Sequence, residues 1–194
     1  LFLILSIICS VSVGAIFKLA RRYSINNSQI VAANYIFALA LCYFFFSPDL
    51  AAVGVDVPWG IYVSLGFLLP SIFLFLAASI KNVGIVKTDA AQRLSLFIPI
   101  LAAWLIFGEQ FNTLKITAFL IAFPALLLIL TKPSDNTENK WVYPAVVLVG
   151  FGLIDILFKQ IALYTNLPYT TSLFVVLGIA MAIMLVVTGV EIRY

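Results

Sequence analysis

The stretch VKTDAAQRLSLFIPILAAWLIFGE (residues 86–109) joins a long apolar run to charged and amide side chains at its start. The part made only of apolar residues, serine and proline, residues 94–107, is too short to cross a bilayer, because a spanning helix needs about 20 residues. If residues 86–109 span a membrane, Asp89, Gln92 and Arg93 therefore lie at membrane depth. Charges near the bilayer centre cost about 2.5–3.5 kcal/mol each, so such side chains normally face an interior or a watery cavity.

On a helix, Asp89, Gln92 and Arg93 fall on one face, and Asp89 and Arg93 are one turn apart and able to pair. Two interpretations stay open. The three side chains line a polar cavity, or Asp89 and Arg93 form a salt bridge at the interface where the helix enters the membrane. Because intramembrane charges are functional by default, the cavity is the favoured interpretation.

Composition places the whole chain in a membrane. Of its 194 residues, 64% are hydrophobic and 10% are charged, whereas a soluble domain carries about 25% charged residues. We therefore predict an all-α, polytopic membrane helix bundle. The net charge of +3 lies in loops beside apolar helices, where the positive-inside rule accounts for it, so no nucleic-acid partner is expected.

Several kinds of catalytic centre are excluded by the residues present. The chain has no histidine, which rules out a histidine metal site, a Ser–His triad and a histidine proton relay. Cys9 and Cys42 lie in apolar segments without metal-ligand spacing, so neither a metal nor a cofactor is expected. Without a paired-acid metal motif or a Ser–Lys dyad, we predict that the protein is not an enzyme.

The apolar segments predict seven helices and a division of the chain into two parts. A polar run, KPSDNTENK (residues 132–140), reads as a linker. It separates residues 1–131, which hold five expected helices, from residues 141–194, which hold two. The expected helices cover residues 1–20, 29–47, 59–80, 86–109, 113–130, 141–164 and 169–190.

Three further polar residues lie inside these helices. Asn34 is in the second helix, where an amide serves either as a hydrogen-bonding link between helices or as a cavity lining. Asp155 and Lys159 are one turn apart in the sixth helix. Asp155 lies well inside the span and is therefore a candidate functional residue, whereas Lys159 is nearer the end and can snorkel to the interface.

The two parts of the chain show a weak internal repeat. IFKLARRYS (residues 16–24) aligns with LFKQIALYT (residues 157–165), and three positions coincide: Phe17 with Phe158, Lys18 with Lys159, and Tyr23 with Tyr164. A repeat of five helices is odd-numbered, so its second copy enters the membrane upside down. Inverted repeats that meet at a midplane site are typical of secondary transporters. Three more helices are then expected downstream, which makes ten in the full-length protein.

In this pattern the chain resembles the EamA-type members of the drug/metabolite transporter superfamily. The most specific resemblance is a short turn after the third helix, a small-residue start at Asp89-Ala90-Ala91, Pro99 in mid-helix and Gly108-Glu109 at the exit. The resemblance implies that Pro99, Gly108 and Glu109 are structural. The chain departs from the family pattern by placing Asp89, Gln92 and Arg93 where small apolar residues are usual.

The resemblance further implies a carrier in the bacterial inner membrane that moves amino acids, other metabolites or drug-like solutes without hydrolysing ATP. In this reading Asp89, Gln92, Arg93, Asn34, Asp155 and Lys159 line the pathway of the substrate or ion. A carboxylate there can carry a proton, and Arg93 can hold an anionic group of the solute. Exchange without a coupling ion fits equally well. A homodimer is left open.

Two arguments predict different orientations of the chain in the membrane. The basic residues lie almost all on one side of the seven-helix arrangement, with Lys115 alone on the other. The positive-inside rule then places the start of the first helix outside the cell, whereas the resemblance implies that both ends of the ten-helix protein lie in the cytoplasm. The alternative functions are a non-transporting membrane scaffold, a seven-helix receptor-like protein and an intramembrane enzyme.

Overall fold

A computed structural model of the chain describes residues 26–54, 57–105, 108, 112–131 and 141–193, together with the single positions 4, 8 and 12. The described residues are helical and contain no strand. Their helical segments are α2 (Asn27–Phe46), α3 (Trp59–Val83), α4 (Ile85–Leu94), α5 (Phe97–Leu105), α6 (Thr113–Thr131), α7 (Val142–Tyr164) and α8 (Tyr169–Arg193).

Four of these helices are long and apolar enough to cross a membrane, namely α2, α3, α7 and α8. α6 has a shorter apolar stretch, Ile116–Leu130. The chain is thus an all-helical integral membrane protein, as composition predicts. Six of the seven expected helices fall within the described residues, with the fourth in two segments. Apart from positions 4, 8 and 12, the first expected helix lies outside the described residues, as does the linker at residues 132–140. The five-helix inverted repeat stays a prediction.

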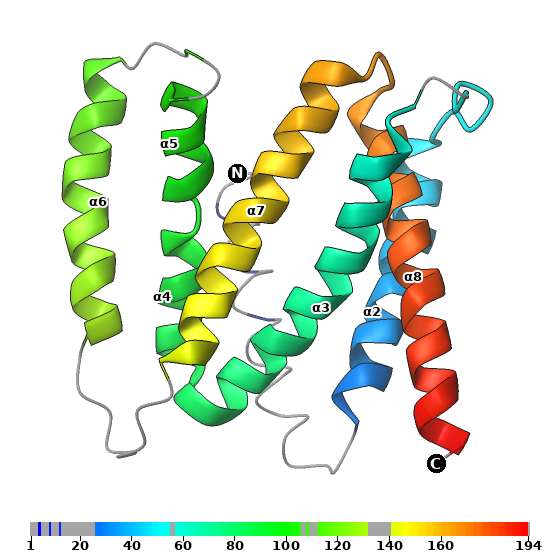
Figure 1. Cartoon of the computed structure of the whole chain (residues 1–194), viewed down its shortest axis with the longest axis horizontal. Helices are drawn as coiled ribbons and strands as arrows, with labels where there is room; N and C mark the ends of the chain where they lie inside the picture. Colours follow the sequence, from blue (N-terminus) through cyan, green and yellow to red (C-terminus); the bar gives the residue numbers. More distant parts are fainter. Residues whose placement is uncertain are drawn as a thin grey trace.

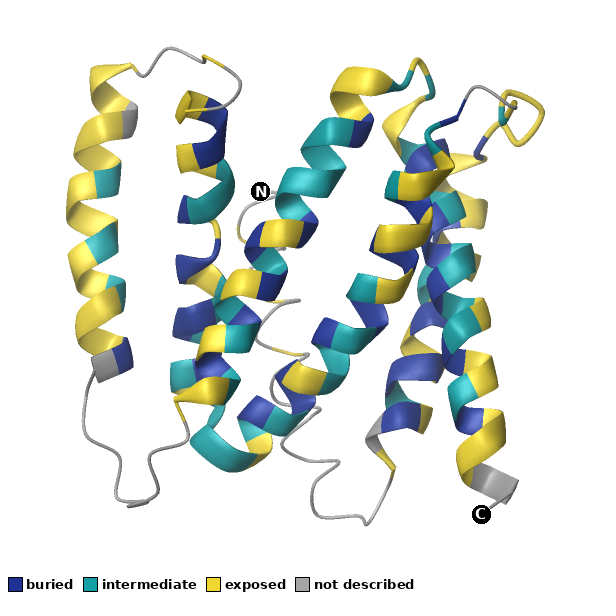
Figure 2. Cartoon of the chain, in the orientation of Figure 1, coloured by how far each residue is buried: buried dark blue, intermediate teal, exposed yellow. Residues whose placement is uncertain are grey.

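α3 is the helix around which the others are arranged (Figure 1). It packs against α7 on one side and α8 on the other, while α2 packs along α8. α4 and α5 pack against α7, and α6 lies at the edge of the bundle against α4. Figure 2 shows that the buried residues gather on the inward sides of α2, α3 and α8, whereas α6 is exposed over most of its surface.

Small residues allow close contact between the helices. Three glycines lie at crossings where an added Cβ would overlap an isoleucine of the neighbouring helix: Gly66 (α3) against Ile179 (α8), Gly150 (α7) against Ile72 (α3), and Gly152 (α7) against Ile98 (α5). Without a hydrophobic force between helices in lipid, such close packing is a main source of association.

The single continuous helix expected at residues 86–109 is wrong, because the structure breaks it into α4 and α5 at Ser95-Leu96. Pro99 explains the position of the break. Proline has no N–H to donate to the carbonyl four residues earlier, which belongs to Ser95, and its ring clashes there. The Ser95 carbonyl instead accepts the N–H of Ile98 at 3.0 Å, in a tighter turn.

α3 and α4 meet at a sharp corner made by Gly84, which confirms the short turn expected after the third helix. Gly84 has φ +94° and ψ 162°, a conformation that is available essentially only to glycine. Thr88 reinforces the corner, because its Oγ1 donates to the Gly84 carbonyl at 2.8 Å and lies 2.7 Å from Ser79 Oγ in a buried pair. Lys81 and Lys87 each lie three residues from Gly84 in the sequence.

Gly84→Ala is expected to lower the free energy of unfolding by about 1–3 kcal/mol, because an L side chain is strained at this φ and ψ. The change is measured as a lower thermal unfolding midpoint of the detergent-purified protein. Gly54→Ala is the matched control, since Gly54 lacks a positive φ and an added Cβ there meets nothing within 4 Å. Equal midpoints for the two variants would contradict the strained corner.

Candidate functional site

The polar face of α4 carries an ion pair. Arg93 Nε donates to Asp89 Oδ2 at 2.8 Å, and each side chain is 44% exposed. The opposite face of the helix is small and buried, since Ala90, Ala91 and Leu94 pack against the neighbouring helices. The burial pattern therefore turns Asp89 and Arg93 outward from the packed core of the described helices.

This pair can neutralise itself and still bind an anion. Among the contacts that the structure describes, Arg93 donates through Nε, which leaves the two Nη groups of its guanidinium for another acceptor. A guanidinium presents its donors in a planar fork that matches a carboxylate or phosphate. The salt bridge predicted from the sequence is therefore present, whereas the cavity lining stays a prediction.

Gln92 places an amide next to the break between α4 and α5. Its side chain is partly buried, and its main-chain carbonyl accepts the Ser95 hydroxyl at 2.6 Å. The break at Ser95-Leu96 begins two residues after Arg93. Interrupted helices beside polar side chains are a recurring way in which transporters build a binding site at membrane depth.

Asp155 and Lys159 form a second polar region on α7, and both are partly buried. Asp155 lies within electrostatic range of Tyr169 at the start of α8. The ring of Tyr169 contacts that of Phe158, with centroids 6.1 Å apart. Sequence reasoning missed Tyr169. Tyr169 follows directly after the short loop between α7, which carries Asp155, and α8, and this position in the sequence could have identified it.

The two polar regions lie at different heights in the bundle. Gly152 on α7 meets Ile98 on α5, which puts these residues at one level. Arg93 precedes that level and Asp155 follows it, and at a rise of about 1.5 Å per residue they are about 12 Å apart along the parallel helices. The described helices therefore do not join Asp89, Gln92 and Arg93 with Asp155 and Lys159 in one contact cluster.

Asn34 lies apart from both regions. Its side chain is exposed on α2, whose main packing partner is α8. The adjacent Tyr35 instead points into the core, where it is 1% exposed and meets Phe73 edge-on at 6.1 Å. Neither interpretation of Asn34, as a helix–helix link or as a cavity lining, is supported by a contact among the described residues.

Two of the three residues expected to be structural can be placed. Pro99 is partly buried in the first turn of α5 and causes the break described above. Gly108 has φ +65°, a left-handed conformation that suits a glycine after a helix end. Glu109 lies outside the described residues.

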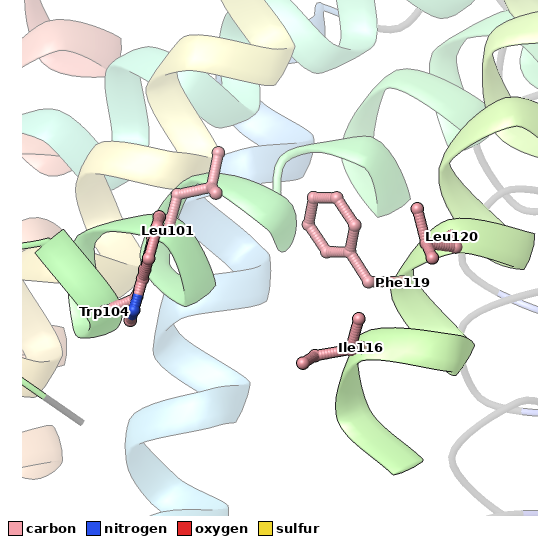
Figure 3. Close-up of a pocket in the computed structure, with 5 residues that line it drawn as sticks. All are labelled: Leu101, Trp104, Ile116, Phe119 and Leu120. Carbon is pink, nitrogen blue, oxygen red and sulfur yellow. The ribbon is translucent and has the colours of Figure 1, made fainter. Parts of the chain in front are cut away.

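A cleft of about 260 Å³ opens between α5 and α6 (Figure 3). Its lining is apolar, with Leu101 and Trp104 on one side and Ile116, Phe119 and Leu120 on the other. Phe119 also contacts the rings of Phe97 and Phe123, and this aromatic cluster joins the two helices. The cleft has no charged lining residue and therefore lacks the chemistry of a site for a polar solute.

Comparisons with known proteins found one relative. No protein-family model matches the chain, and no solved structure gives a significant match. An uncharacterized protein of Haemophilus influenzae (strain ATCC 51907 / DSM 11121 / KW20 / Rd) is 39% identical, over 95% of this chain and 66% of its own length. The chain thus spans slightly less than two thirds of that relative, whose description names no substrate or activity.

Proposed function

We propose that the chain belongs to a secondary transporter of the EamA type, which moves a small metabolite or drug-like solute by alternating access. The observation that carries the proposal is the Asp89–Arg93 pair on a broken helix, within a bundle that has four helices of membrane-spanning length. Solute carriers commonly place their sites at interrupted helices near the midplane. The relative from Haemophilus influenzae is a bacterial protein, and a location in the bacterial inner membrane is part of this proposal.

In this proposal Arg93 binds an anionic group of the solute through its Nη donors, while Asp89 orients the guanidinium through Nε. Gln92 supplies neutral donors and acceptors beside it. Asp155 and Lys159 act at a second level of the pathway, about 12 Å further along. Transport is driven either by a proton that Asp89 or Asp155 carries, or by the exchange of one solute for another.

Flux of a pooled metabolite library into and out of proteoliposomes, with and without a pH gradient, tests this proposal on the full-length protein. We expect selective flux of a small set of solutes that carry a carboxylate or phosphate. Dependence of that flux on the pH gradient supports proton coupling, whereas flux that needs a solute on the opposite side supports exchange. Absence of flux for every solute would contradict a transporter and favour a membrane scaffold.

A further inference from the structure

The ends of α2 and α8 are joined by a carboxylate clamp. Glu191, in the last turn of α8, receives the Asn26 Nδ2 donor at 2.9 Å on Oε2 and the Ser28 hydroxyl at 3.1 Å on Oε1. Glu191 lies more than 160 positions after both of its partners in the sequence. We name Asn26, Ser28 and Glu191 the terminal clamp.

Asn26 is held in place for this contact by its role at the start of α2. Its Oδ1 accepts the N–H of Ser28 at 3.2 Å and so caps the helix. Its amide nitrogen is then directed to Glu191. Ser28 is buried, at 5% exposure. Both oxygens of the carboxylate are therefore paired with donors whose positions the helix start determines.

The opposite end of the same helix pair is closely packed, with the rings of Tyr43 and Phe174 in contact at a centroid distance of 6.1 Å, but its polar contact is weak. There, within the described part of the chain, the polar contact from α2 to α8 is the long one between Cys42 Sγ and the Thr170 carbonyl, 3.9 Å. The neighbouring Thr171 is 1% exposed, and its buried hydroxyl has no hydrogen-bond partner. The buried Thr165 hydroxyl, in the loop before α8, is likewise without a partner.

Between the two ends, the contact is apolar. Val31 and Tyr35 of α2 belong to one buried cluster with Val176, Ala180 and Met184 of α8. Van der Waals contact between apolar side chains has no directional bonds, so small rocking of the helices against each other keeps most of their attraction. Charge-assisted hydrogen bonds are directional and hold one arrangement. The polar contacts therefore decide which end of the pair is closed.

We propose that the terminal clamp is a gate latch, which closes the bundle at the end where α2 begins and α8 ends, whereas the Thr171 end is packed but has no such clamp among the described residues. The proposal rests on the transporter function above, in which α2 and α8 are the second helices of the two inverted repeats. In the alternate state the clamp opens, α2 and α8 approach each other more closely at the Thr171 end, and the buried threonine hydroxyls gain partners.

Distances between spin labels test the latch without any solute. In a background in which alanine replaces Cys9 and Cys42, one label pair at positions 29 and 190 reports the clamp end, and one at 46 and 166 reports the opposite end. Glu191→Ala is expected to change the ratio of the two states by about tenfold or more, since it removes two hydrogen bonds to a charged group. The clamp-end distance lengthens and the opposite-end distance shortens.

Gly189→Ala is the matched control, because it lies in the same last part of α8 and its added Cβ meets nothing within 4 Å. Ser28→Ala removes one of the two bonds and gives a smaller shift in the same direction, which keeps the test valid if Glu191→Ala does not fold. Unchanged distances in both clamp variants, or longer distances at both ends, would overturn the latch.

The distances separate this proposal from the transporter proposal. Shifted distances in a protein that moves no solute would support the latch as a conformational device and reject transport. Normal flux with unshifted distances in Glu191→Ala would reject the latch and leave the transporter proposal intact.

Discussion

Replacing Arg93 with alanine is expected to lower solute flux in proteoliposomes by about tenfold or more. The physical reason is the loss of a hydrogen-bonded charge partner for the solute, since hydrogen bonds to charged groups contribute about 1.5–3 kcal/mol. Arg93→Lys keeps the charge but loses the planar fork, so it is expected to raise KM more than it lowers the maximal rate. Flux is measured with the anionic solute selected from the metabolite library.

A double variant separates binding from ion pairing. If Arg93 serves only to neutralise Asp89, to which it bonds at 2.8 Å, then Arg93→Ala leaves a lone charge and Asp89→Ala/Arg93→Ala restores flux. If Arg93 binds the solute, flux stays low in the double variant. Asp89→Asn adds a third result, because loss of the pH-gradient dependence alone would mark Asp89 as a proton carrier. Full flux in all variants would show that the Asp89–Arg93 pair is structural and does not bind the solute.

Gly66→Leu is expected to produce the largest loss of stability. A Cβ at this position overlaps both Cγ2 and Cβ of Ile179, and the Cβ of Ile179 is attached to the α8 main chain and cannot rotate away. The α3–α8 contact must therefore open. Overpacking of this kind lowers the free energy of unfolding by about 1–3 kcal/mol or more, and the thermal midpoint of the purified protein falls accordingly.

Two variants show whether the helix crossing is the cause. Gly60→Leu lies on the same helix, where an added Cβ meets nothing within 4 Å, and it is expected to keep the wild-type midpoint. Ile179→Ala shortens the opposing side chain, so Gly66→Leu/Ile179→Ala is expected to be more stable than the sum of the single changes predicts. Equal losses for Gly66→Leu and Gly60→Leu would contradict close packing at this crossing.

The placement of the helices was largely predictable, because a membrane helix needs a long apolar run and the chain supplies one wherever a long helix is described. The break at Ser95-Leu96 was also predictable in principle, since Pro99 removes a donor from the fourth expected helix and the rule for proline locates the disturbed carbonyl. The sequence suggested the Asp89–Arg93 pair from spacing alone, and the pair forms as expected at 2.8 Å.

The side that each polar residue faces was not predictable. α2 has apolar residues on all sides, so no stripe distinguishes the packed face from the lipid face. For this reason the sequence could not show that Asn34 lies on the exposed side of α2. In the structure Asn34 is exposed, and the adjacent Tyr35 is buried. The role of Glu191 was also hidden, because its partners Asn26 and Ser28 lie more than 160 residues earlier in the chain.

The sequence by itself therefore determined the class of protein, the helix-forming segments and the local pairing within one helix turn, because these follow from hydropathy, proline chemistry and helical periodicity. The tertiary structure decided which helices touch, which levels the polar side chains occupy and which ends of α2 and α8 are joined. Those features depend on contacts between residues far apart in the chain. Such contacts are selected by shape, as at the glycine–isoleucine crossings, and leave no periodic signal in the sequence.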